Sequence, residues 1–452
     1  MGNLLTSLLN TANALGVYNQ ALATTENNVV NASTPGYARQ VQTLVALPFD
    51  LAVGFPGGVG AGSVESTRSA YAEQSVRTQQ SQLGSRQQAA ADLEPLQSYF
   101  NLSSSNIPST IDGLFSAFSQ LSVNPNDTLS RQGVLNAAQQ VAASFQQTAT
   151  GVASTGAAVD NETRGAVDAI NRLSGKIAHI NASRANNGAN GADAGVDANL
   201  HSALEEHSQY ADVKALQQPD GSITVYLGGQ TPLVLGDTAV TLRADFSGPR
   251  TRIVDPEGKD VTSLIHEGKL AGMLDVKNIK LPSYLADLNT LAQSVADQVN
   301  TALSNGVDQN GATPTADLFA TNPAFGAAAT LSVNPLTPDQ IAAALPGAPG
   351  GNGNALALAQ LAAARGLQGS SLTQFYGGLA GRVGRDISNA RDDSSTDQQL
   401  LTQAQSLRSQ LSGVSLDHEA TNLIALQRAY QATAKMLTIL NDLTQTVINI
   451  IP

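Results

Sequence analysis

The chain has 452 residues and a mass of 46.5 kDa, which is enough for about two to four domains. Its formal net charge of -12 disfavours nucleic acid and anionic membrane surfaces as partners, because both are negatively charged. The absence of cysteine excludes disulfides and thiolate sites, and a charged fraction of 13% supplies few of the clustered titratable groups that catalysis needs.

The first 20 residues do not read as a secretory signal peptide. They lack a positively charged start and a continuous apolar core before a small-residue cleavage site. No apolar run approaches the roughly 18 residues expected of a membrane-spanning helix. If the chain leaves the cell, we therefore expect a route without a cleaved signal.

The first predicted helix runs from about Leu4 to Val30. Apolar residues recur along it at a spacing of seven, which predicts a coiled-coil seam. These residues are Leu8, Leu15, Leu22 and Val29. The helix is expected to end before Pro35-Gly36, because proline disfavours helix at the preceding residue and Pro-Gly suits a type II turn.

Gly-rich, β-like sequence follows over about 39–67, and helical patterns return at about 69–99, 111–121 and 129–180. Residues 184–199 are rich in Gly, Asn and Ala and predict a linker. Alternation at Ile223, Val225 and Leu227 then indicates strands. We interpret 201–263 as a small antiparallel β-domain inserted between helical halves.

Helices are predicted again at about 270–274, 284–303, 356–364, 372–388 and 397–411. Between them, residues 305–354 are rich in Gly, Pro, Asn and Ala and predict a long loop or a second small insertion. The predicted fold class is therefore mainly α with an inserted small β-domain.

The last predicted helix, from about Leu416 to Ile450, carries a second apolar stripe. Its members are Leu416, Leu423, Leu426, Tyr430, Leu437 and Leu440. Two interpretations stay open. The two terminal helices could pair within one chain and close a monomer, or they could become ordered only against further copies in a polymer.

No catalytic, cofactor or metal site is predicted. His201 and Glu205 share a helical face, but His207 lies six residues after His201 and points elsewhere, so a zinc site is disfavoured. The sequence Asp308–Gly311 begins like a calcium loop but lacks the later ligands, and predicts a turn. Phosphate-binding and nucleophile-elbow motifs do not occur in a strand-turn-helix context.

Two terminal stretches resemble the signatures of bacterial flagellar axial proteins, the family of rod, hook and hook-associated proteins. The first comprises Asn27, Asn28, Asn31, Ser33, Pro35, Gly36 and Tyr37, and the second Gly413, Asn422, Gln427 and Tyr430. His418 and Thr421 depart from the usual pattern of the second signature. The block 267–311 is similar to the hook-associated members in particular.

This resemblance implies three structural layers. Residues 1–36 with 413–452 would form a coiled-coil inner core, and 37–200 with 264–412 a helical middle domain. Residues 201–263 would form an outer antiparallel β-domain. The Leu, Val and Tyr residues of the two stripes would then serve self-assembly, and those of the last helix would also bind a chaperone.

The resemblance further implies a structural subunit at the hook–filament junction. It would leave the cytoplasm unfolded through flagellar type III export, with a cytosolic chaperone on its C-terminal helix. Outside the cell it would form a homo-oligomeric ring, with hook protein below and a second junction protein and the filament above.

Three alternatives remain. The nearest is another axial protein, such as a hook or distal rod subunit. The others are a peptidoglycan hydrolase, which would need a carboxylate pair or zinc triad, and a cytosolic coiled-coil adaptor.

Overall fold

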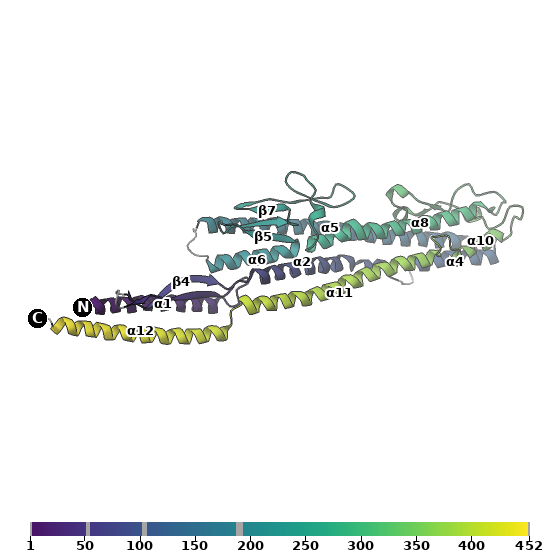
Figure 1. The fold of residues 1–452 in the computed structure, drawn as a ribbon. Coiled ribbons are helices and arrows are strands. Elements are labelled where there is room, and N and C mark those ends of the chain that lie inside the picture. Colours follow the sequence, from purple (N-terminus) through teal and green to yellow (C-terminus); the bar gives the residue numbers. More distant parts are fainter. Residues whose placement is uncertain (1, 51–54, 102–105, 187–192, 451–452) are drawn as a thin grey trace.

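The computed structural model describes residues 2–50, 55–101, 106–186 and 193–450. Figure 1 shows an elongated molecule in which the first and last helices, α1 (Gly2–Val30) and α12 (Leu416–Ile450), lie side by side at one end. The chain ends lie together there, and the remaining helices form a longer body. The architecture is mainly helical with a small antiparallel sheet, as the sequence predicted.

Between α1 and the body, the chain forms an antiparallel hairpin that lies on α1. It consists of β1 (Gln40–Ala46) and β4 (Val59–Ser66), with the short pair β2 (Phe49–Asp50) and β3 (Phe55–Pro56) at its tip. The positive φ of Gly58 and a close approach to Asn10 favour glycine there, because a Cβ would come 2.3 Å from the Asn10 Oδ1. This confirms the expectation of extended, Gly-rich segments in this region.

The body is built around one long helix, α5 (Thr128–Asn186), which spans most of its length. Along it pack α2 (Ala70–Leu93), α4 (Ile107–Val123), α6 (Ala194–Tyr210) and α8 (Leu281–Ser304). Shorter helices are α3 (Leu96–Tyr99), α7 (Lys269–Asp275), α9 (Ala327–Thr330) and α10 (Gly353–Gln360). The turn Val276–Lys280 between α7 and α8 is a π-helix.

The helix α11 (Leu372–Ser412) returns along α2 toward the terminal pair as one continuous element. The prediction of two helices, 372–388 and 397–411, was therefore wrong about the gap. The intervening residues are polar and have no apolar period, but they contain neither Pro nor Gly. The helix passes through them with mostly exposed side chains while both flanks pack on the body.

The outer sheet covers α5 with four antiparallel strands in sequential order. They are β5 (Val213–Gln217), β6 (Ile223–Leu227), β7 (Thr231–Leu235) and β8 (Thr238–Ala239), followed by the pair β9 (Arg243–Asp245) and β10 (Arg252–Val254). Residues 201–210, which the sequence analysis placed in the β-domain, belong instead to α6. Asp193 caps that helix, and Leu200, Ala203 and Leu204 are buried in the core, so packing outweighs the weak helical period.

Residues 305–354 form a small insertion with secondary structure of its own. It contains β11 (Phe319–Ala320) paired with β12 (Ser332–Val333), and its residues Ile341, Ala342 and Ala343 are buried in the main core. The three short 3-10 turns of this half are Pro323–Phe325, Pro338–Gln340 and Leu361–Ala363, and a fourth lies at Thr262–Leu264.

Helical asparagines hold the extended segments in place. Five asparagine side chains each form two hydrogen bonds with the backbone of one residue in an extended segment. The Asn NH₂ group donates to that residue's C=O, and the Asn Oδ1 accepts from its N–H, so the amide replaces the backbone of a neighbouring strand. The pairs are Asn28 with Gln40, Asn171 with Leu242, Asn181 with Ile223, Asn278 with Thr251 and Asn300 with Phe319. Strand edges that face a helix thereby keep their backbone groups satisfied.

Candidate assembly site at the terminal helices

The most buried positions of α1 are small or polar side chains. Thr11, Ala21, Thr25 and Asn28 face α12 and the hairpin, together with Val17. The predicted stripe lies beside this face, since Leu8, Leu15 and Leu22 are half-buried and Val29 is exposed. Two helices and a hairpin thus leave part of each leucine uncovered.

On α12 the predicted stripe divides in the same way. Leu423, Leu426, Leu437 and Leu440 are half-buried and form the seam toward α1, whereas Leu416 and Tyr430 are exposed. Of the second signature, Asn422 is half-buried, and Gln427 is exposed like Tyr430. The seam accounts for one side of the helix.

A second apolar surface runs along the flank of α12 beside the seam. We call it the outer face; it consists of Ala425, Ala432, Met436, Ile439 and Leu443, all exposed. Met436 is 58% exposed and Ile439 51%, and at 100° per residue the five positions lie about a third of a turn from the seam. Such a continuous apolar surface is typical of an interface that another molecule covers.

The hairpin and the start of α1 add further exposed apolar side chains to this end of the molecule. Phe49 is 71% exposed, and Val45, Leu5 and Leu9 are each at least half exposed. Figure 1 places these elements together with α12 at the end that carries both chain termini. The terminal end of the molecule therefore carries exposed apolar side chains on both helices and on the hairpin.

Where α1 ends, the predicted signature forms a hydrogen-bonded corner. Asn28 is 1% exposed; its amide donates to Gln40 O at 2.8 Å and accepts from the Tyr37 hydroxyl at 2.9 Å. Asn27 donates to that hydroxyl, and Asn31 donates back to Asn27. Ser33 and Pro35 are exposed in the turn itself. The asparagines thus close the helix end and fix the turn.

An ion pair joins this corner to the start of α12. Arg39 Nε lies 2.6 Å from Glu419 Oε1, and Asn28 donates to the other carboxylate oxygen at 3.2 Å. Glu419 is 1% exposed. Burial, then the charge of Glu419, raises the pKa of Tyr37, whose hydroxyl therefore stays protonated as a donor. Sequence reasoning missed Glu419, for which the only signal was an acidic residue in the first turn of the helix.

The two connecting segments are also tied to each other through their backbones. Arg39 N donates to Ser412 O at 2.9 Å, and Ser69 N donates to Ser412 Oγ at 2.9 Å. Gly413 follows directly, where a Cβ would come 2.4 Å from Ser409 O. Thus the ends of α1 and α11 and the beginnings of α2 and α12 meet at one place, which we call the four-helix corner.

Arg68 connects the four-helix corner to the body. Its guanidinium donates to Gly36 O at 2.7 Å, to Asp197 Oδ2 at 2.9 Å and to Glu73 Oε1 at 2.6 Å. Gly36 lies against α6, with a φ of +75° and no room for a Cβ. The turn of the signature is thereby held against α6.

The side chains that were considered as zinc ligands contact the helices that pack around α6. Glu205 pairs with Arg408 at 2.5 Å, and His207 is fully buried with its Nε2 3.2 Å from Ser174 Oγ. Burial, reinforced by the neighbouring Arg68, lowers the pKa of His201 to about 4. Within the described residues no group of three or more His, Cys, Asp or Glu side chains could hold a metal ion.

Asp308 acts as a turn-forming residue. Its carboxylate accepts from the backbone N–H groups of Asn310 and Ala312, each at 2.8 Å. This confirms the prediction of a turn at 308–311.

Among the described helices, none combines the length and the apolar composition that a membrane span requires.

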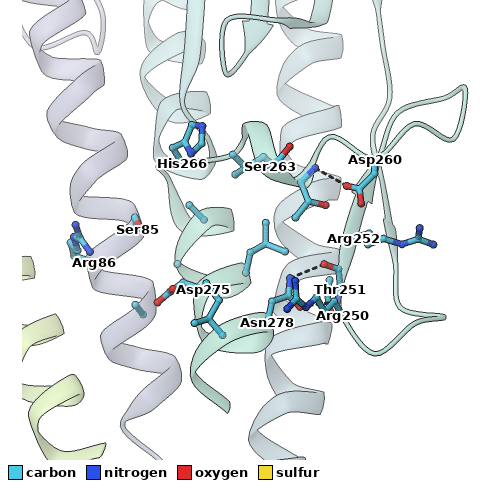
Figure 2. Close-up of a pocket in the computed structure, with 17 residues that line it drawn as sticks. Ser85, Arg86, Arg250, Thr251, Arg252, Asp260, Ser263, His266, Asp275 and Asn278 are labelled. Carbon is cyan, nitrogen blue, oxygen red and sulfur yellow. Dashed lines mark hydrogen bonds between the residues drawn. The ribbon is translucent and has the colours of Figure 1, made fainter. Parts of the chain in front are cut away.

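A cavity of about 600 Å³ lies between α2, the π-helical turn and the segment 250–266 (Figure 2). Its polar groups are engaged in holding the loop, since Asn278 exchanges two hydrogen bonds with Thr251 and Asp260 accepts from Thr262 N. Arg86 and Asp275 line the opposite side in Figure 2. Among the labelled residues there is neither an activated nucleophile nor an acid–base pair arranged for catalysis.

Comparison with known proteins places these features in a family. The model of the flagellar hook-associated protein FlgK helical domain matches residues 93–319, and that of the flagellar basal body rod FlgEFG protein C-terminal matches 406–450. Flagellar hook-associated protein 1 of Bacillus subtilis is 27% identical over 96% of both chains. The Escherichia coli protein of the same name is 24% identical over 68% of this chain and 59% of its own length.

A solved structure confirms the fold. The flagellar hook junction protein FlgK from Burkholderia pseudomallei superposes with a TM-score of 0.67 at 16% identity. The match covers 75% of this chain and 99% of that one.

Proposed function

This chain belongs to the flagellar hook-associated protein FlgK family and is a structural component of the bacterial flagellum at the hook–filament junction, and we propose that it forms a ring there through its terminal helices. Its relatives are structural flagellar proteins rather than enzymes. The observation that carries the proposal is the outer face of α12, an apolar surface that the chain's own fold leaves uncovered.

Covering that surface supplies a driving force for association. Burying one large aliphatic side chain contributes about 1.5–3 kcal/mol, and Met436, Ile439 and Leu443 are all about half exposed in the single chain. In a ring each copy contacts its two neighbours through two different surfaces, so the outer face would pack against another surface of the next copy, and the same pair of surfaces recurs at every contact. The seam toward α1 keeps the helix in place within each copy.

We extend the proposal to the order of layers. Residues 1–36 with 413–452 would form the inner core, 37–200 with 264–412 the middle domain, and the segment 201–263 would face outward. Support comes from the position of the terminal pair at one end of the molecule and of the sheet on the side of α5. Hook protein would lie below the ring, and a second junction protein and the filament above it.

Export and chaperoning complete the proposal. We propose that the chain leaves the cytoplasm unfolded through flagellar type III export, and that a cytosolic chaperone covers α12 until then. An exposed apolar helix face in the cytoplasm would otherwise associate with other chains, and one such chaperone would cover both the seam and the outer face.

The decisive experiment is deletion of the gene, followed by electron microscopy of the cells and immunoblotting of the medium for flagellin. We expect hooks without filaments and flagellin lost to the medium, both restored by the wild-type gene. Normal filaments in the deletion strain would contradict the proposal. Short or absent hooks would indicate the alternative, a hook or distal rod subunit.

A further inference from the structure

The helix α1 carries an exposed stripe of its own, on the side away from its buried residues Thr25 and Asn28. We call it the α1 face; it consists of Leu5, Leu9, Gly16, Ala23 and Val30, all exposed. Leu5, Leu9 and Val30 are 56%, 58% and 80% exposed. From Leu9 onward the members recur at a spacing of seven, which is the repeat of a coiled-coil seam. Each terminal helix therefore has a seam that the single chain leaves uncovered.

Gly16 is the member of the α1 face that the fold of one chain does not explain. Glycine is less favourable in a helix interior than any residue except proline. Among the described residues, nothing comes within 4 Å of the place where a Cβ of Gly16 would lie, so packing within the chain does not require glycine. A residue without a side chain lets another backbone approach closely. The open space at Gly16 thus fits a helix from another chain.

The α1 face and the outer face of α12 match in their levels along the molecule. Asn28 donates to Glu419 near the four-helix corner, and from there both helices extend to the end that carries the chain termini (Figure 1). Leu9 lies about 19 residues from Asn28 and Ile439 about 20 from Glu419, so both are about 30 Å from that hydrogen bond. The pairs at equal levels are Leu5 with Leu443, Leu9 with Ile439, Gly16 with Ala432 and Ala23 with Ala425. Large side chains are thus level with large ones, and small with small.

The charges beside the two faces have opposite signs. Glu26 is the one charged residue of α1, and it is exposed beside the α1 face. Arg428 and Lys435 lie beside the outer face of α12, and neither has an acidic partner in the part of the chain that the structure describes. Complementary charges favour a specific orientation of two surfaces.

We propose that the outer face of α12 in one copy packs against the α1 face of the next copy. This inference rests on the proposed ring and names the surface that receives the outer face. Copies related by rotation about a ring axis lie at the same level, so the level of each residue within one chain also holds between neighbours. Every copy then uses its outer face toward one neighbour and its α1 face toward the other, and α1 and α12 helices alternate around the ring.

Disulfide crosslinking tests the contact without background from native thiols, because the chain has no cysteine. Hook–filament particles are isolated from cells that carry only the variant Leu9→Cys/Ile439→Cys, oxidised with copper phenanthroline and immunoblotted for this chain without reductant. We expect a ladder of crosslinked oligomers that reductant removes, and monomer alone for each single variant. Leu5→Cys/Leu443→Cys is an independent pair and should give the same ladder. Leu9→Cys/Thr438→Cys is the matched control and should stay monomeric, because Thr438 is exposed at the same level on another side of α12.

A size change at Gly16 gives a second readout. Gly16→Leu should leave urea unfolding of the purified chain no weaker than in the wild type, because the site is open in one copy. In cells it should abolish swimming, since the added side chain would meet Ala432 of the next copy. Gly16→Ala should keep both properties. Normal swimming of Gly16→Leu would contradict the close contact.

The outcomes separate this inference from the proposed function. Particles that contain the chain but give no ladder with either pair would overturn the inference and leave the junction role intact. Crosslinking of Ile439→Cys alone, or of Phe49→Cys/Ile439→Cys in place of the two pairs, would overturn it too, because α12 would then face a second α12 or the hairpin. Absence of the chain from the particles would contradict the proposed function itself.

Discussion

Glu419, in the first turn of α12, is buried against Arg39 from the other end of the chain, with 2.6 Å between the Arg39 Nε and the carboxylate. The same carboxylate accepts from Asn28 at the end of α1. One acidic side chain therefore fixes the start of α12 to the end of α1 and the segment that follows it, although these parts lie up to 391 residues apart in the sequence. We expect the packing of α12 against the end of α1 to depend on this carboxylate.

Removing the cation of this pair tests that dependence. Arg39→Ala leaves Glu419 buried without its charge partner, and because Arg39 is 25% exposed we expect a moderate loss of about 1–3 kcal/mol. Hydrogen exchange should rise in α1 and α12 with little change in α5. Glu419→Gln keeps the hydrogen bond from Asn28 and should lose less. A uniform rise over the whole chain would contradict a local role for the pair.

The sequence predicted the two terminal helices and the turn at Pro35-Gly36 because their signals are local. Heptad spacing and Pro-Gly chemistry depend only on neighbouring residues. The buried positions of α1 were less predictable. Thr25 and Asn28 carry no hydrophobic signal, and their burial results from the hairpin and from Glu419, which lies 391 residues beyond Asn28.

The contrast between local signals and long-range packing also explains the two differences between the predicted and the observed structure of the body. The helix at 201–210 and the uninterrupted α11 are stabilised by packing against distant helices, which a local period does not report. The cluster of Arg68, Glu73 and Asp197 was equally hidden, since its members come from separate elements. Charges that pair in space leave no pattern in the order of residues.

Gly36 should not tolerate even a methyl group. A Cβ there would come 2.3 Å from Ala198 O, and the φ of +75° is itself unfavourable for alanine. Gly36→Ala should therefore displace the turn from α6 and cost at least about 1 kcal/mol, measured by urea unfolding. Gly16→Ala is the matched control, since no atom lies within 4 Å and alanine favours helix. Equal stabilities of the two variants would contradict the close packing of the turn.

The outer face of α12 should serve assembly and not the folding of a single chain. Replacing Met436, Ile439 and Leu443 by Ser should change the stability of the monomer by only about 0.5 kcal/mol per site, because these side chains are already exposed. In cells the variant should be exported but fail to support filaments. Urea unfolding, immunoblots of the medium and swimming assays measure the three effects.

A matched set on the same turns provides the control. Thr438, Asn441 and Gln445 are exposed polar residues, and their replacement by Ser should leave swimming intact. Filaments assembled normally by the outer-face variant would show that the ring uses another surface.

Acid should destabilise the protein through His207. Burial lowers its pKa to about 4, against about 6.5 in the unfolded chain. Between these values the unfolded chain binds a proton and the folded chain does not, so stability falls as pH drops from about 6.5 toward 4 and is unaffected above that range. The full loss is on the order of 3 kcal/mol. Urea unfolding at pH 7.5 and pH 5 should show a smaller difference for His207→Gln, whereas His179→Gln, at an exposed site, should behave as wild type.

Arg131 fixes the insertion at 305–354 to the start of α5. Its side chain is 1% exposed and donates to Ile341 O at 2.6 Å and to Pro125 O at 2.8 Å, with Pro338 O and Asp339 O at 3.3–3.4 Å. Only a guanidinium has donors spread widely enough to reach both sides. Arg131→Met keeps the apolar stem but leaves buried carbonyls without donors.

We expect Arg131→Met to lose about 2–4 kcal/mol of unfolding free energy in urea, from the desolvated carbonyls and the lost charge-assisted bonds. The unfolding free energy of Arg131→Lys should lie between those of the wild type and Arg131→Met, because one ammonium group cannot satisfy both sets of oxygens. Arg172→Met, at a side chain 65% exposed on the same helix, should change stability by no more than about 1 kcal/mol. If Arg131→Met were as mild as Arg172→Met, the insertion would be held by its buried Ile341, Ala342 and Ala343 alone, and hydrogen exchange there would stay slow.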